Sequence, residues 1–316
     1  MKIGIITDVH VRGKSPINRI DDFYVSIMEK FTEALKIFKK KKCDIILDAG
    51  DLLHSPIISL TICDDIIDLI DNNKIHYYTV FGNHPMLNAH IENSKATTLA
   101  HMFRRSEYLK YLEHLKVDNK NDKHKINIKG MEYSHGIEDI IKNGGIHHNK
   151  KFDTVTIAVV HAMITEKKMM DKILHIPYKD LKTNYDYVIV GHNHHEIGIQ
   201  KVGDTTIIGL GALARLTMDK KDYTRKPKVA VLDTETGEVE VIKLKTAKPY
   251  KEVFNLELME KKKKADANLE VFAQTLEDTK LQSIDTIGLI MEIAKKKEID
   301  KNIINAIITK MESFDE

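Results

Sequence analysis

The chain has 316 residues, which is enough for one large domain and an appendage. Its 49 Lys and Arg residues nearly balance its 47 Asp and Glu residues, and a net charge of +2 does not indicate a strongly basic nucleic-acid-binding surface. No apolar run approaches the roughly 20 residues of a membrane span. Two cysteines, Cys43 and Cys63, exclude a disulfide framework, and no signal-peptide pattern precedes the first strand. We therefore expect a cytoplasmic protein without a membrane segment.

Strands and helices alternate over the first 81 residues. Apolar runs at 2–7, 43–49 and 76–81 predict buried strands. Between them, residues 21–42 and 59–73 predict helices, and the first has apolar side chains at helical spacing. These are Phe23, Ile27, Phe31, Leu35 and Phe38. Strand–helix–strand order predicts a sheet with parallel pairs.

The remaining chain changes character twice. The pattern predicts a helix over 94–116 and a polar loop region over 118–151. Further strands are expected near 155–160, 187–190, 205–208 and 228–233, followed by a hairpin turn at 233–237 and a return strand. From about residue 250 three helical patterns follow, at 256–278, 283–298 and 300–314. The predicted organisation is a catalytic domain at 1–245 and a helical tail at 246–316.

Short motifs of His, Asp and Asn follow five of the predicted strands. Functional groups of sheet proteins with helical crossovers collect at such strand ends. All the candidate ligands have oxygen or nitrogen donors, and none is Cys, which disfavours a structural zinc site. The candidate metal ligands are Asp8, His10, Asp51, Asn83, His161, His192 and His194. The set predicts a dinuclear metal centre.

The spacing of the ligands suggests how such a centre is assembled. Two ions need a bridging carboxylate, and Asp51 stands alone between the His-bearing motifs. Asp8 and His10 are two positions apart, so in an extended segment they would share a face. His84 alternates away from Asn83, and we expect it to serve as a donor or general acid to a substrate phosphate.

In this order and spacing, the motifs D-x-H, G-D, G-N-H, a lone H and G-H-x-H resemble the calcineurin-like metallophosphoesterase superfamily. The resemblance covers roughly residues 1–245 and implies a four-layer α/β sandwich, in which helices flank two mixed β-sheets. Within the superfamily the chain is most similar to the SbcD-type nuclease subunit of the double-strand-break repair complex. Three features favour this branch: segment 49–56, which contains His54, segment 19–23, and segment 209–215 with the strand at 226–232.

The resemblance also implies roles for the motif residues. Asp8, His10 and His194 would hold the first ion, and Asn83, His161 and His192 the second, with Asp51 bridging. His84 would stabilise the transition state and protonate the leaving oxygen, while His54 would position the substrate phosphate. The chain departs from the family at Pro85, where an Asp usually supports the catalytic His. The cofactors implied are two divalent ions, with Mn favoured and Fe or Zn as alternatives.

Three functions remain open at this point. The first is a DNA exo/endonuclease that works with an SbcC-type coiled-coil ATPase in DNA repair or recombination. The second is a stand-alone phosphoesterase on nucleotides or small phosphate esters, and the third a catalytically inactive scaffold. The scaffold would be expected to lack ligands, and none is missing. The apolar tail positions fit either an ATPase partner or a fold-back onto the catalytic domain, and a homodimer is left open.

Overall fold

The computed structural model describes residues 1–16, 19–88, 90–118, 125–149, 153–169, 173–218 and 220–258, and positions 291, 294, 299–300 and 302–305. By its internal contacts the chain divides into two compact units, Met1–Val253 and Phe254–Glu316. The first unit therefore continues past residue 245. Most of the three predicted tail helices lies outside the described residues. Among the helices that are described, none combines the length and the apolar character that a membrane crossing requires.

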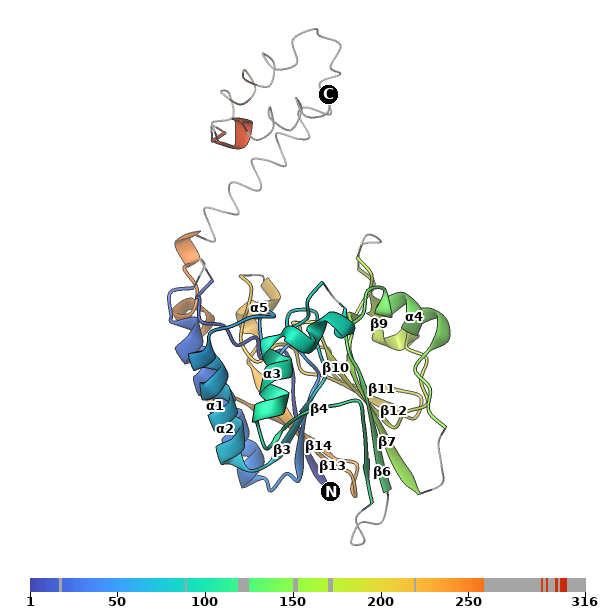
Figure 1. Cartoon of the computed structure of the whole chain (residues 1–316). Coiled ribbons are helices and arrows are strands. Elements are labelled where there is room, and N and C mark those ends of the chain that lie inside the picture. Colours follow the sequence, from blue (N-terminus) through green and yellow to red (C-terminus); the bar gives the residue numbers. More distant parts are fainter. Residues whose placement is uncertain are drawn as a thin grey trace, which may run out of the picture. The chain divides into compact units, whose positions relative to one another are not determined.

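The first sheet has six strands in the order β14-β13-β1-β2-β3-β4 (Figure 1). They are β1 (Lys2–Ile6), β2 (Ile45–Asp48), β3 (His76–Thr79), β4 (Leu109–Tyr111), β13 (Lys228–Asp233) and β14 (Val239–Lys243). Strands β1 to β4 are parallel, whereas β13 pairs antiparallel with both β1 and β14. Gly237 donates its N–H to the Asp233 carbonyl in the turn between β13 and β14, as the sequence predicted.

The second sheet also has six strands, in the order β11-β12-β10-β7-β6-β5. They are β5 (His114–Val117), β6 (Lys125–Met131), β7 (Thr154–His161), β10 (Tyr187–Gly191), β11 (Gly198–Val202) and β12 (Thr205–Gly209). Its four central strands are parallel and its two edge strands antiparallel. A separate short pair joins β8 (Ile164–Thr165) and β9 (Ile176–Pro177). Both large sheets are thus mixed.

Helices cover the outer face of each sheet (Figure 1). On the first sheet these are α1 (Phe23–Lys40), α2 (Leu60–Asn73) and α3 (Thr98–Arg105), and on the second α4 (Ile137–Gly144). Short elements complete the unit: η1 (Ile91–Ala96), η2 (Tyr178–Asp180), α5 (Lys220–Thr224) and η3 (Tyr250–Glu252).

Alternation along the strands divides the core into layers. Ile45 and Leu47 face the core between the sheets, where they join Ile157 and Val159 of β7. Ile46, between the first two, belongs to the core under α1 and α2. The four-layer α/β sandwich expected from the sequence is therefore confirmed.

Two predictions for the middle of the chain were wrong. The helix expected over 94–116 ends at Arg105, and β4 and β5 follow it. The chain turns there because the Asp71 carboxylate accepts backbone N–H groups of Glu107 and Tyr108. The region 118–151, expected to be loop, contains β6 and α4. In β6 the buried side chains Ile126 and Ile128 alternate with exposed ones, a signal that the polar composition obscured.

A test of this packing uses Gly4 of β1. A Cβ at this position would lie 2.7 Å from Cδ1 of the buried Phe38 ring in α1. We expect Gly4→Ala to lower the free energy of unfolding by about 1–3 kcal/mol in denaturant titrations, because the core must shift. Gly144→Ala is the control, since nothing lies within 4 Å of its added methyl group. Equal denaturation midpoints for Gly4→Ala and the natural chain would contradict this packing.

Candidate metal centre

The motif residues converge where β1, β2, β7 and β10 end. The segments that follow β1 and β2 remain hydrogen-bonded to each other. The N–H of Asp8 donates to the Gly50 carbonyl at 3.1 Å, and the N–H of His10 donates to the Asp51 carbonyl at 2.8 Å. Asp8, His10, Asp51 and His192 all have positive φ angles, between 50° and 83°. The expected extended segment from Asp8 to His10 was therefore wrong. Left-handed backbone at non-glycine residues is uncommon and gathers at functional sites.

Two motif glycines allow the strand ends to approach one another. A Cβ at Gly82 would lie 2.0 Å from Oδ1 of Asp51, and one at Gly191 would lie 2.2 Å from the Ala49 carbonyl oxygen. Neither obstacle is a flexible side-chain end, because Asp51 is fully buried and Ala49 contributes backbone. These glycines are needed for close approach of the backbone.

A first group of ligand atoms comprises Asp8, His10, Asp51 and His194, all within 4.8 Å of one another. The Nε2 atoms of His10 and His194 are 2.9 Å apart. Each of these Nε2 atoms lies 3.9 Å from Oδ1 of Asp8. The Asp8 carboxylate is held in place by the Thr7 hydroxyl and by the backbone N–H of His192. This group has the donors and spacing of one metal site.

A second group comprises Asp51, His161 and His192, again within 4.8 Å. Oδ1 of Asn83 lies 3.2 Å from Nε2 of His161, so the amide adds a fourth donor. The other ring nitrogen of His161, Nδ1, lies 2.7 Å from the Ala49 carbonyl. That contact fixes the ring and directs Nε2 at the cluster, as a hydrogen-bonded carbonyl does for histidines that bind metals.

Asp51 connects the two groups. Its Oδ2 atom is buried and makes no hydrogen bond among the described residues. It lies 3.6 Å from Nε2 of His10 in the first group and 3.4 Å from Nε2 of His161 in the second. A buried carboxylate oxygen without a donor is costly unless a cation compensates it. The residues present therefore fit two ions that share Asp51.

Electrostatics in the cluster favour the neutral imidazole, the form that binds metal, at three of the four ligand histidines. Burial lowers the pKa of His10 and of His194, and it lowers the pKa of His192 to about 3. At His161 burial acts in the same direction, but the Asp51 carboxylate outweighs it and raises the pKa to about 9. Burial works against a charged Asp51, yet the imidazoles around it hold its pKa below the usual range.

His84 and His54 lie side by side next to the first group. Their rings stack with centroids 4.6 Å apart, and together with His10 they form a third set of ring nitrogens within 4.8 Å. Nδ1 of His84 lies 3.0 Å from the His54 carbonyl oxygen. That carbonyl orients His84 in place of the family's usual Asp, which is Pro85 in this chain. With Nδ1 engaged, Nε2 of His84 is left to face a substrate.

The sequence motifs did not indicate every residue around the site. Arg12 donates to Nε2 of His54 at 2.7 Å, and nothing in the motif pattern singled it out. Asp48, which belongs to neither ligand group, is buried and accepts the Gly50 N–H at 3.1 Å. Arg215 is buried and donates to backbone carbonyls, among them that of Lys248 at 2.6 Å.

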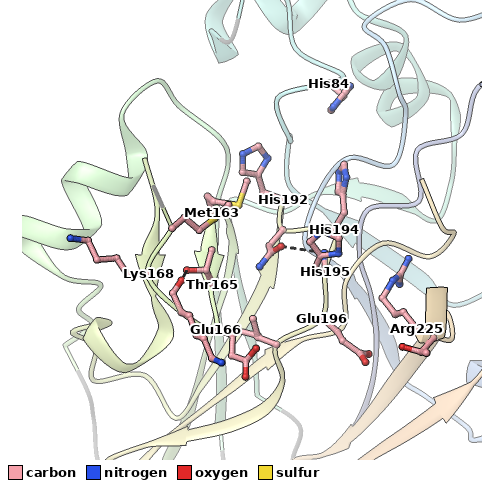
Figure 2. Close-up of a pocket in the computed structure, with 15 residues that line it drawn as sticks. His84, Met163, Thr165, Glu166, Lys168, His192, His194, His195, Glu196 and Arg225 are labelled. Carbon is pink, nitrogen blue, oxygen red and sulfur yellow. Dashed lines mark hydrogen bonds between the residues drawn. The ribbon is translucent and has the colours of Figure 1, made fainter. Parts of the chain in front are cut away.

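A pocket of about 670 Å³ opens beside the cluster. His84, His192 and His194 line it, so groups bound there would reach both ligand groups. Figure 2 shows His192 and His194 with His84 above them, and Lys168 and Arg225 on opposite sides of the view. The Lys168 side chain is exposed, whereas Arg225 is buried against the Asp222 carboxylate at 2.6 Å.

Comparison with known proteins gives one assignment. Residues 1–237 match the model of the calcineurin-like phosphoesterase superfamily domain. No curated protein matches the sequence. Similar solved structures include the protein TT1561 of Thermus thermophilus, at 10% identity and TM-score 0.44, covering 77% of this chain and 98% of that one. Yfce, a phosphoesterase from E. coli, has 12% identity and TM-score 0.35, covering 77% and 99%. These two similarities are too weak to add to the family match.

Two substitutions separate metal binding from chemistry. Asp51→Asn weakens the shared ligand, and we expect purified protein to lose bound metal as well as activity. His84→Ala should keep both ions while kcat falls by roughly 10²-fold or more, the scale of a positioned acid. Plasma mass spectrometry measures metal per chain, and His135→Ala, at an exposed position, is the control. Loss of an ion from the His84 variant would show that His84 is a ligand.

Proposed function

The chain belongs to the calcineurin-like phosphoesterase superfamily, and from this membership we propose that it is a two-metal phosphodiesterase whose substrate is DNA. Membership implies phosphoester hydrolysis. Within this class of reaction, the bonds cut would be the phosphodiester bonds of DNA, by exonuclease and endonuclease action in DNA repair or recombination. Two divalent ions would be held by the ligands named above, with Asp51 between them.

The observation that carries the proposal is the buried Oδ2 atom of Asp51, which lies between His10 and His161 and makes no hydrogen bond to the described residues. When bound, a pair of divalent ions supplies positive charge for the phosphate oxygens and a nucleophilic water at neutral pH. Backbone contacts hold the buried ligands in position, so the positive charge of the ions would be in place before the substrate binds.

His84 supplies the acid. Its Nδ1 is engaged by the His54 carbonyl, and its ring lines the pocket beside the cluster. A proton on Nε2 can therefore pass to the leaving oxygen of the substrate, and the fixed ring keeps that proton aimed. His54, stacked on His84, would help to position the phosphate.

DNA is favoured by the segments that resemble the SbcD branch. Arg19 forms a bidentate ion pair with Asp21 at 2.7 Å and donates to the Arg215 carbonyl at 2.6 Å. Two of the segments that carried the resemblance, 19–23 and 209–215, are thus in direct contact, and Leu213 of the second donates its N–H to the carbonyl of the ligand Asp8. This contact supports the view that both segments serve the same site.

A metal and substrate assay tests the proposal. Four imidazoles, two carboxylates and one amide suit Mn²⁺ better than Mg²⁺, which seldom accepts several imidazoles. EDTA should abolish hydrolysis and Mn²⁺ should restore it better than Mg²⁺, on duplex DNA ends and on bis(p-nitrophenyl) phosphate. Full activity with Mg²⁺ as the sole bound metal would contradict the proposed centre. Cleavage of small esters or cyclic nucleotides but never of DNA would favour the stand-alone phosphoesterase.

We also propose an SbcC-type ATPase as partner, bound through the apolar positions of the tail. The sequence places Ile284, Ile287, Ile303 and Ile304 among many such positions there. Removing residues 280–316 should abolish co-purification with the ATPase and leave metal content and small-ester hydrolysis unchanged. A truncated chain that still co-purifies would place the contact elsewhere, and one that unfolds would favour packing of the tail on the protein itself.

A further inference from the structure

A second pocket, of about 700 Å³, lies beside the far edge of His54. Arg12 and Lys14 line it, as do Ser59 and Ile62 from the first turn of α2. No metal ligand contributes to its lining. His54 connects it to the cluster, because Nδ1 of its ring lies 3.3 Å from Nδ1 of His10, while Nε2 accepts from Arg12. One imidazole ring thus separates Arg12 from the proposed metal ligands.

Arg12 is a cation without a counterion. Within the described part of the chain no carboxylate pairs with it, and its buried Nε atom has no hydrogen-bond partner. The nearby Asp21 carboxylate is already engaged by Arg19, and both guanidinium groups lie over the same Phe23 ring, at 4.9 and 4.8 Å. Burial and the Arg19 charge lower the pKa of Arg12, although an arginine remains protonated. The charge is therefore held at an energetic cost.

The surroundings of the pocket add to this positive potential. The helix α2 begins here with Ser59 as its N-cap, and its first turn contains no acidic residue, so its N-terminal end remains positive. Lys14 is exposed at the rim. An anion would relieve the repulsion among these groups, and a guanidinium with free donors is suited to the oxygens of a phosphate. Ile58 and Ile62 offer apolar surface beside it, fitted to a sugar or base.

We propose that this pocket binds the phosphate next to the scissile one in a polynucleotide strand, with Arg12 as its main donor. The proposal rests on the nuclease function proposed above and extends it, since it requires a substrate with at least two linked phosphates. A strand would cross the metal ligands between the pocket at His84 and this one at Arg12. Small phosphate esters would occupy only the pocket at His84.

Binding provides the first test. The full-length natural chain, Arg12→Ala, Arg12→Lys and the control Arg104→Ala, an exposed arginine on α3, are titrated in EDTA with a fluorescent single strand of about 12 nucleotides. Each phosphate contact on a single strand contributes about 0.7 to the slope of log Kd against log salt. We expect Arg12→Ala to reduce the slope by about 0.7 and raise Kd about tenfold. Arg12→Lys should keep the slope with weaker affinity, and Arg104→Ala should match the natural chain.

Hydrolysis provides the second readout. With Mn²⁺, the ratio of kcat/KM for the oligonucleotide to kcat/KM for bis(p-nitrophenyl) phosphate should fall about tenfold in Arg12→Ala, because only the longer substrate reaches the pocket. An unchanged ratio together with an unchanged salt slope would overturn the phosphate subsite while leaving the nuclease function intact. If the natural chain hydrolyses the small diester but neither binds nor cuts the oligonucleotide, the nuclease function itself fails, and the subsite with it.

Discussion

The buried Oδ2 atom of Asp51 is the constraint on which the site depends. Among the described residues it makes no hydrogen bond, and imidazole nitrogens approach it from two sides, at 3.6 and 3.4 Å. Without metal, the buried carboxylate loses water and is compensated by the neighbouring imidazoles alone. Two cations would compensate the charge of the Asp51 carboxylate and so stabilise the same arrangement. The cluster is therefore best understood as a set of ligands that folding places in advance, at a cost recovered on metal binding.

The fold enforces this convergence through its backbone. The ligands Asp8, Asp51, His161 and His192 lie at the ends of strands from two different sheets. They meet because Gly82 and Gly191 have no side chains, which would otherwise keep those strand ends apart. Left-handed turns at Asp8, His10 and Asp51 then aim the side chains inward. The same packing places Arg12 beside His54, so a charge outside the ligand set becomes part of the active-site surface.

The main strands and the proximity of the candidate ligands could be predicted because they follow from local signals: alternation, helical spacing and polar residues at strand ends. The four layers were implied by the resemblance to the family. Prediction from the sequence failed where a distant contact decides the structure. The end of α3 depends on Asp71, a residue of α2, and the support of His84 comes from a backbone carbonyl at His54, which no side-chain motif reveals. Arg12 was missed for the same reason: the sequence does not show that none of the described carboxylates pairs with it.

The most direct test of this account is anomalous X-ray diffraction from crystals of the protein grown with Mn²⁺. Two manganese peaks are predicted, one among Asp8, His10 and His194 and the other among Asn83, His161 and His192, with the Asp51 carboxylate between them. A single peak, or a peak held by His54 and His84 in place of Asp51, would contradict the two-metal centre.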